Sequence, residues 1–263
     1  MGRIIAIANQ KGGVGKTTTS INLSSCLAEK GKKVLAIDLD PQGNMTSGLG
    51  VEKESVENTV YELILGECTI KESISKTVVD NLTIIPSNVN LAGAEIELLG
   101  INDKEYILKT AVDYIRDDYD FIIIDTAPTY DNLVMNALYA ADYIFTPVQL
   151  DFFNLTTSRF LRSHLYDELN EQVPKWYIYY TFWQENLAVF PESIQSQFAV
   201  LFESEFNNIL DIQIPNTPAT RKYTQTDEKV SIHSRMLGSQ RLAVSFNKLA
   251  NLITGTENDV EKF

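Results

Sequence analysis

Short runs of Ile, Val and Leu recur along the first half of the chain, with little polar alternation inside them. Five runs stand out, at 3–9, 33–40, 81–87, 120–126 and 142–148. Strands that are buried on both faces have this pattern, because helices cover both sides of a parallel sheet. We therefore expect each run to form an inner strand of one sheet.

Segments with apolar residues at helical spacing lie between these runs. The clearest are 16–30 and 103–117, and a further helix is expected at 132–141. Strands that alternate with helices form βαβ units, in which the strands are parallel. The predicted fold is therefore α/β, a doubly wound, mostly parallel sheet flanked by helices on both faces. In such sheets, ligands bind at the carboxyl ends of the strands.

The pattern is weaker after residue 150. We expect a strand at 176–182, an amphipathic helix at 190–206 and a closing helix at 239–253. No Pro-, Gly- or Ser-rich linker, low-complexity tract or internal repeat interrupts the sequence. The whole of 1–263 is therefore expected to form a single domain, with a clearly patterned half, 1–150, and a less regular half, 151–263.

The composition is that of a globular protein with a full core, since 44% of the 263 residues are hydrophobic and 22% are charged. No run of 18 or more apolar residues occurs, which argues against a membrane-spanning helix. The opening sequence MGRIIAIANQ has one basic residue and no small-residue cleavage site, so a signal peptide is not expected. We expect a cytoplasmic protein with no membrane partner.

Two cysteines occur, Cys26 and Cys68, and neither is part of a CxxC motif or a Cys/His cluster. Zinc and iron–sulfur sites would therefore lack ligands. Cys26 falls on the apolar stripe of the helix 16–30, where we expect a small core residue rather than a reactive thiol.

The strongest chemical signal is a glycine-rich loop between the first strand and the first helix. It consists of Gly12, Gly13, Val14, Gly15, Lys16, Thr17 and Thr18. Glycines let the backbone turn sharply, so that successive N–H groups and the start of the helix face a phosphate. In this arrangement Lys16 reaches the β- and γ-phosphates, and the Thr17 hydroxyl binds Mg²⁺. The loop therefore predicts a nucleotide site, with ATP and Mg²⁺ as cofactors.

Carboxylates follow two of the predicted strands. Asp125 ends the run FIIID, and Asp38 and Asp40 end VLAIDLD. A carboxylate is costly in a buried strand, whereas beside a phosphate loop it orients the Mg²⁺ shell, the role that we expect for Asp125. Side-chain alternation puts Asp38 and Asp40 on one face. We favour Asp40 as the group that positions the attacking water beside the metal, and a turn-forming Asp-Pro is the alternative.

Together these motifs resemble those of a known family. KGGVGKTT, which begins with an extra lysine, Lys11, and the segments AIDLDPQGN and IIIDTAP are similar to the deviant Walker A family of ParA, MinD and the nitrogenase iron protein. The likeness is greatest to short ParA/Soj partition ATPases, through residues 4–50 and 90–99. It is dense over 1–150, the nucleotide-binding half, and thin over 151–263.

The resemblance implies an ATP-dependent homodimer that dissociates after slow hydrolysis. Lys11 would reach across to the γ-phosphate of the other subunit, where extra positive charge stabilises the transferring phosphoryl oxygens as an arginine finger does. Asp40 would lie in the first switch segment, and Asp125 would begin the second switch segment, 125–132. The stimulating partner in this family is a ParB-like adaptor, which binds DNA and carries a basic N-terminal peptide.

The sequence departs from the family pattern at three places. The second switch carries Asp131 where the family has a small turn, and we expect Asp131 to cap the helix that follows. An extra negative charge near the phosphates is the alternative role. Residues 183–186 stand where partition ATPases carry a DNA-contacting arginine. The family's adenine-holding Pro-Arg-Asn stretch is reduced to Pro215 and Asn216, which the resemblance still assigns to the adenine.

Binding of duplex DNA, as in partition ATPases, needs basic residues on one face. The formal net charge of the whole chain is −13, which repels nucleic acid. Residues 216–250 nevertheless contain six basic and two acidic residues. The candidate DNA contacts in this segment are Arg221, Lys222, Arg235 and Arg241. We expect non-specific binding of double-stranded DNA that weakens with salt.

There are three alternatives to a DNA-partitioning ATPase. A MinD-type membrane cycle needs a basic amphipathic helix at the end of the chain, whereas TGTENDVEKF is acidic. The altered second switch would also suit an ATP-binding scaffold that barely hydrolyses. The third alternative is a ParA-like positioning ATPase for a protein cargo, without nucleoid binding. The sequence names neither the cargo nor the partner.

Overall fold

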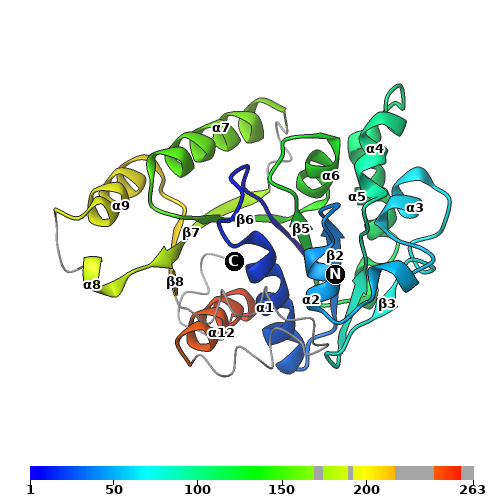
Figure 1. Cartoon of the computed structure of the whole chain (residues 1–263), viewed down its shortest axis with the longest axis horizontal. Helices are drawn as coiled ribbons and strands as arrows, with labels where there is room; N and C mark the ends of the chain where they lie inside the picture. Colours follow the sequence, from blue (N-terminus) through cyan, green and yellow to red (C-terminus); the bar gives the residue numbers. More distant parts are fainter. Residues whose placement is uncertain (169–173, 189–191, 217–239, 256–263) are drawn as a thin grey trace.

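The computed structural model describes residues 1–168, 174–188, 192–216 and 240–255, which form one central sheet between two layers of helices (Figure 1). The eight strands of the sheet are ordered β3-β4-β2-β5-β1-β6-β7-β8. β3 pairs antiparallel with β4, and the other described pairs are parallel. The predicted doubly wound, mostly parallel sheet is confirmed. Because strands of both halves of the chain join this sheet, it is compatible with one domain over 1–263, which stays a prediction.

The strands agree with the five apolar runs and with the strand expected at 176–182, and the structure adds two more. They are β1 (Arg3–Ile7), β2 (Val34–Leu39), β3 (Ser75–Lys76), β4 (Leu82–Ile85), β5 (Phe121–Thr126), β6 (Tyr143–Val148), β7 (Lys175–Trp183) and β8 (Ile209–Pro215). β1, β2, β5 and β6 lie in the middle of the order, where helices cover both faces. Their continuous hydrophobicity follows from this position, because neither face meets water.

The helices lie on both faces of the sheet (Figure 1). They are α1 (Lys16–Glu29), α2 (Asn44–Gly48), α3 (Val60–Leu65), α4 (Leu91–Glu97), α5 (Ile107–Asp113), α6 (Asn132–Ala140), α7 (Phe152–Glu168), α8 (Glu185–Ala188), α9 (Ile194–Glu205) and α12 (Gln240–Thr254). In the described ranges, none of these helices has the length and the apolar character that a bilayer crossing requires.

Separate hydrophobic clusters hold the two helical layers on the sheet. α1 and α12 pack on one face through residues such as Leu23 and Phe246. The expected core residue Cys26 is buried in this cluster. α3, α4, α5 and α6 pack on the opposite face around residues such as Leu108. α7 and α9 extend that second layer over β6 and β7 through residues such as Phe202.

The apolar runs did not predict β8, the strand at one edge of the sheet. Leu210, Ile212 and Ile214 are buried in this strand, while Asp211 and Gln213 between them are exposed. A strand with one face exposed to solvent alternates between apolar and polar residues. Because β8 contains no continuous apolar run, it was not expected from the sequence.

The expected helix over 103–117 is shorter than its pattern. Only Ile107–Asp113 is α-helical, and 3-10 turns flank it at Lys104–Tyr106 and Arg116–Asp118. The helix expected at 190–206 begins at Ile194 in the structure. The short helices α2, α3, α4 and α8 were not predicted, because they have too few residues to show a periodic pattern, and the longer α7 was not predicted, because apolar and polar residues are poorly segregated in it.

Candidate functional site

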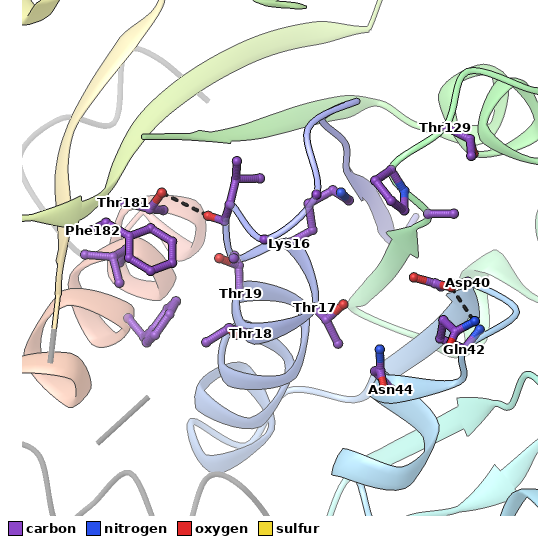
Figure 2. A pocket seen from close by; sticks show the side chains of 18 of the residues that line it. Lys16, Thr17, Thr18, Thr19, Asp40, Gln42, Asn44, Thr129, Thr181 and Phe182 are labelled. Carbon is purple, nitrogen blue, oxygen red and sulfur yellow. Dashed lines mark hydrogen bonds between the residues drawn. The ribbon is translucent and has the colours of Figure 1, made fainter. Parts of the chain in front are cut away.

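A cavity of about 710 Å³ opens where several parallel strands end, above the start of α1 (Figure 2). The described residues that line it are Gly12, Gly13, Val14, Gly15, Lys16, Thr17, Thr18, Thr19, Asp40, Pro41, Gln42, Asn44, Ala127, Pro128, Thr129, Thr181, Phe182, Ile214, Pro215 and Phe246. Asp40 and Phe182 lie on opposite sides of the α1 start in Figure 2. The cavity therefore has a polar end and an apolar end, with the glycine-rich loop between them.

The glycine-rich loop turns in a way that glycine adopts at little cost. Gly13 has a φ of 75° and Gly15 a φ of 99°, both in the left-handed region. A Cβ at Gly13 would meet nothing within 4 Å, so this side of the loop is open. Gly15 is also the N-cap of α1, and no side chain caps that helix. The first N–H groups of α1 are therefore available to an anion in the cavity.

Lys16 is buried at the start of α1, with 6% of its surface exposed. Its Nζ donates a hydrogen bond to the carbonyl oxygen of Lys11 at 3.3 Å. Burial lowers the pKa of Lys16, although the carboxylates of Asp125 and Asp40 act in the opposite direction. An ammonium group carries three donors, so Lys16 can add phosphate oxygens to its present contact.

The register of the parallel strands sets Asp125 on β5 directly beside Asp38 on β2, and both are fully buried. Burial, and then the neighbouring Asp38 carboxylate, raises the pKa of Asp125 to about 7, and the hydroxyls of Thr17 and Ser20 act against this rise. Ser20 Oγ donates to Asp125 Oδ1 at 2.8 Å. Asp125 Oδ2 is buried with no hydrogen-bond partner in the described part of the chain. A buried carboxylate oxygen of this kind calls for a cation or its bound water.

Asp38 and Asp40 differ in what their side chains contact. Asp38 Oδ2 accepts hydrogen bonds from the backbone N and the hydroxyl of Thr46, at 2.8 and 2.7 Å, and so holds α2 in place. Burial raises the pKa of Asp38 to about 6, and the Thr46 hydrogen bonds counteract part of the rise. Asp40 lines the cavity, and its Oδ1 accepts from the backbone N of Gln42 at 2.9 Å. The structure therefore places Asp40, the residue favoured from the sequence, against the cavity.

The three residues expected at the metal lie at the polar end of the cavity. Thr17 and Asp40 line it, and the fully buried Asp125 carboxylate lies within reach of the Thr17 hydroxyl. The described residues contain no group of three or more His, Cys, Asp or Glu side chains that could hold a metal by themselves. Mg²⁺ usually keeps several waters and takes phosphate oxygens together with one or two protein ligands. The residues present fit a magnesium ion that is shared with a bound phosphate.

Lys11 does not line the cavity of its own chain. Its Nζ forms an ion pair with Asp151, the residue before α7. The backbone N of Lys11 donates to Oδ1 of Asn9 at 2.9 Å, and Asn9 in turn donates to Oδ1 of Asn154 at 3.1 Å. The side chain of Lys11 is thus held on the α7 side of the loop, outside the cavity that the other loop residues line.

The apolar end of the cavity is formed by β7, β8 and α12. Its side chains belong to Thr181, Phe182, Ile214, Pro215 and Phe246. The Thr181 hydroxyl donates to the carbonyl oxygen of Val14 at 2.9 Å, which ties β7 to the glycine-rich loop (Figure 2). Of the two residues assigned to the adenine, Pro215 lines the cavity, whereas Asn216 lines a neighbouring pocket with Trp183.

Sequence reasoning did not assign Phe182, Ile214 or Phe246 to the site. Ile214 belongs to the unexpected strand β8, and Phe246 has the spacing of a core residue in a closing helix. Phe182 stands at the carboxyl end of the expected strand 176–182. The rule that ligands bind at such ends could have singled it out. Ser20, which contacts Asp125, was also missed, because a serine one turn into a helix carries no distinctive signal.

The second switch segment contacts α6 and α7 through two of its side chains. The side chain of Asp131 accepts a hydrogen bond from the backbone N of Val134 at 3.0 Å, which confirms the expected helix cap. The ring of Tyr130 lies 4.5 Å from that of His164 and 5.3 Å from that of Phe160, measured between centroids. These aromatic contacts connect the residues after β5 with the middle of α7.

Three of the four candidate DNA contacts, Arg221, Lys222 and Arg235, lie outside the described residues. The fourth, Arg241 on α12, is exposed, and its Nη1 lies 3.3 Å from Oε2 of Glu185. Lys248 on the same helix pairs with Asp211 at 2.9 Å. The two cations of α12 therefore each face a carboxylate, which reduces the positive field of this part of the surface.

Comparison with known proteins extends these observations. A family model described as an AAA domain matches residues 2–173. The chain is 48% identical over 176 residues to the sporulation initiation inhibitor protein Soj of Bacillus subtilis, a match that covers 64% of this chain and 70% of that protein. It is 36% identical over 224 residues to the chromosome-partitioning ATPase Soj of Treponema pallidum, covering 83% of this chain and 87% of that protein.

Solved structures share the fold over nearly the whole chain. A cobyrinic acid a,c-diamide synthase of Mycobacterium smegmatis with bound ADP and magnesium is 29% identical, with a TM-score of 0.79 over 97% of this chain and 94% of that one. A plasmid partition protein of Borrelia burgdorferi bound to AMPPNP is 25% identical, with a TM-score of 0.78 over 97% of this chain and 99% of that one.

Proposed function

The chain belongs to the ParA/Soj family of P-loop partition ATPases, and on this premise we propose that its cavity binds ATP with Mg²⁺ and hydrolyses the ATP to ADP and phosphate. Structural relatives hold ADP with magnesium or the nucleotide analogue AMPPNP. The observation that supports the proposal most directly is Asp125 Oδ2, a buried oxygen that has no hydrogen-bond partner among the described residues and lies close to the start of α1, which no side chain caps. A metal-bound nucleotide would satisfy both groups.

In this proposal the residues of the chain act according to their positions. The N–H groups of the glycine-rich loop and of the first turn of α1 bind the phosphates. Lys16 adds a positive charge at the β- and γ-phosphates. Thr17 and Asp125 hold the Mg²⁺ shell, directly or through water. When bound, Mg²⁺ neutralises charge on the phosphate oxygens and orients them.

Asp40 is the proposed general base for the attacking water. It lines the cavity, and the backbone N of Gln42 fixes its carboxylate by a hydrogen bond of 2.9 Å. A carboxylate held in one orientation can accept the proton of a water molecule as that water attacks the γ-phosphate. Asp38 is the less suitable candidate, because its carboxylate is already engaged by Thr46.

Calorimetry and phosphate release test this assignment. We expect Asp40→Ala to bind Mg-ATP with a Kd within about threefold of the original chain, while its turnover falls about 100-fold or more, as is typical for loss of a general base. Asp80→Asn, which changes an exposed carboxylate far from the cavity, serves as the control. Normal turnover in Asp40→Ala would exclude Asp40 as the base. Absence of heat with Mg-ATP in the original chain would exclude the nucleotide site itself.

Lys11 is proposed to act in the active site of a second copy of the chain. It lies outside the cavity of its own chain, and its ion pair with Asp151 is partly exposed, with 28% and 29% of the two side chains accessible. Exchange of a partly exposed carboxylate for a γ-phosphate involves little change in free energy. Each cavity of an ATP-bound homodimer would then receive one lysine from the other subunit.

We propose two alternatives for the cargo. Non-specific duplex DNA is the cargo expected in this family, and its binding would depend on residues 216–250. The second alternative is a positioning ATPase for a protein cargo that does not bind the nucleoid, and the exposed pairs Arg241–Glu185 and Lys248–Asp211 are compatible with it. Retention of duplex DNA separates the two alternatives.

We propose a ParB-like adaptor as the stimulating partner, in the cytoplasm. A formal net charge of −13 would favour association with a basic peptide of such an adaptor. The test uses the basic N-terminal peptide of an adaptor whose gene lies next to the gene of this chain. Phosphate release should increase when this peptide is added to the chain with Mg-ATP and DNA. A peptide of the same composition in scrambled order controls for charge alone.

A further inference from the structure

The side chains of β7 alternate between the two faces of the sheet as far as Thr181. Tyr179 belongs to the core on the α1 and α12 side, and Tyr180 belongs to the core under α9. Thr181 returns to the first side, where its hydroxyl contacts Val14 of the glycine-rich loop. Continued alternation would send Phe182 to the α9 side. Phe182 instead lines the nucleotide cavity (Figure 2).

The backbone of Phe182 accounts for this change of direction. Its φ is 54°, a left-handed conformation that is uncommon for a residue with a bulky side chain. The pairing of β7 with β8 also shifts register between Tyr180 and Trp183. Such irregularities re-aim a side chain and are frequent beside active sites. As a result Trp183 takes the place on the α9 side and stacks on Tyr180, with ring centroids 5.8 Å apart and planes 8° apart.

The ring of Phe182 does not complete the hydrophobic core. It is only half-buried, and the Thr181, Ile214, Pro215 and Phe246 side chains share its end of the cavity. A strained backbone persists where the surrounding structure imposes it, and such positions cluster at ligand sites. The strain at Phe182 therefore has its clearest explanation in a ligand that meets the ring.

We propose that Phe182 is the base-contacting residue of the nucleotide site, and that its ring stacks on the purine of bound ATP. The inference rests on the ATP site proposed above and extends it to the base. Phosphates at the glycine-rich loop would leave the base at the apolar end of the same cavity. Among the described β7, β8 and α12 residues that line this end, Thr181 is the one with a polar side chain, and its hydroxyl already donates to Val14. Stacking on an aromatic face is then the main contact open to the base.

Three variants distinguish the contribution of the Phe182 ring to nucleotide binding from that of its left-handed backbone and from that of the neighbouring ring. Phe182→Asn removes the ring but keeps a residue that adopts the left-handed conformation readily. Phe182→Tyr keeps an aromatic ring. Trp183→Leu removes the adjacent ring, which lies outside the nucleotide cavity and stacks on Tyr180. Each variant is checked by far-UV circular dichroism before binding is measured.

Calorimetric Kd values are measured for Mg-ATP and for Mg-tripolyphosphate, which has the phosphates without the base. We expect Phe182→Asn to weaken Mg-ATP about tenfold, a typical effect for one base–aromatic stack. Its Kd for tripolyphosphate should stay within about twofold of the original, because the phosphate contacts are unchanged. Phe182→Tyr and Trp183→Leu should bind Mg-ATP like the original chain.

An unchanged Mg-ATP Kd in Phe182→Asn would overturn the proposal. Equal weakening of ATP and tripolyphosphate would assign Phe182 to the phosphate loop and also overturn it. If the original chain bound neither compound, the ATP site would fail before the base contact.

Discussion

At the scale of single residues, Asp38 and Asp125 show how the polar end of the cavity is held. They are fully buried neighbours on adjacent strands, and interacting carboxyl groups of this kind release their protons as a pair. Burial raises their pKa values to about 6 and about 7, so the folded protein keeps protons that the unfolded chain releases near pH 4. The pair therefore lowers the stability of the nucleotide-free protein at neutral pH.

The sign of this effect gives a testable pH dependence. Because the folded-state pKa is the higher one, the stabilising contribution is present at low pH and is lost as the pH rises from about 4 through about 7. We expect Asp125→Asn to raise the free energy of unfolding at pH 8 on the order of 1–3 kcal/mol, and to raise it less at pH 5.5. Thermal melts without nucleotide or divalent cations measure this difference, with Asp80→Asn as the control. Equal stabilisation at both pH values would contradict the expectation.

At the scale of elements, the start of α6 depends on one side chain. Asp131 accepts a hydrogen bond from the backbone N of Val134, as a cap does. We expect Asp131→Ala to lower the free energy of unfolding by about 1 kcal/mol, the usual effect of losing a cap. Urea unfolding followed by circular dichroism measures it.

Asp131→Asn distinguishes the cap from the alternative role of an extra charge near the phosphates. Asparagine is as good a cap as aspartate but carries no charge. Stability and the Kd for Mg-ATP should both remain close to those of the original chain. A tighter Kd in Asp131→Asn would show that the charge acts on the nucleotide.

The strands differ in how well they could be predicted from the sequence. Every inner strand was expected, because a helical layer on each face requires a continuous apolar run. β8 was not, since its residues alternate, and the reversal of side chains at Phe182 could not be expected from β7 alone. A left-handed φ at a phenylalanine depends on the neighbouring strand and on the cavity beside it.

At the scale of the whole molecule, the position of Lys11 outside its own cavity predicts a dimer that needs ATP. We expect light scattering with Mg-ATP to show a dimer for Asp40→Ala, which turns over slowly, and a monomer when Lys11→Ala is added. The lost interaction is the charge of Lys11 on the second nucleotide. Lys76→Ala, an exposed lysine on the edge strand β3, is the matched control. A stable dimer without Lys11 would remove the proposed role.

The acidic charge of the molecule makes DNA binding sensitive to a few ion pairs. If duplex DNA is the cargo, the affinity with ATP should fall steeply as salt is raised. Glu185→Gln releases Arg241 from its ion pair and should tighten binding a few-fold, roughly the effect of one added phosphate contact, while Arg241→Ala should weaken it. Fluorescence anisotropy with a labelled duplex measures both. Absence of binding at low salt would favour the protein-cargo alternative.

The sequence by itself determined the fold class, the glycine-rich loop, the acidic ends of two strands and the cap at Asp131. Each of these depends on residues that are close together in the chain, where spacing and local backbone geometry carry the signal. The carboxylates Asp40 and Asp125 could be named because a charge at the end of a buried run needs an explanation.

Only the tertiary structure decided which groups meet. The register of β2 and β5 places Asp38 beside Asp125, and the ion pair to Asp151 takes Lys11 out of its own cavity. The apolar end of the cavity combines β7, β8 and α12, which are far apart in sequence. Such contacts depend on how strands pair and layers pack. They cannot be predicted from a local pattern of residues, because the residues that meet are far apart in the sequence.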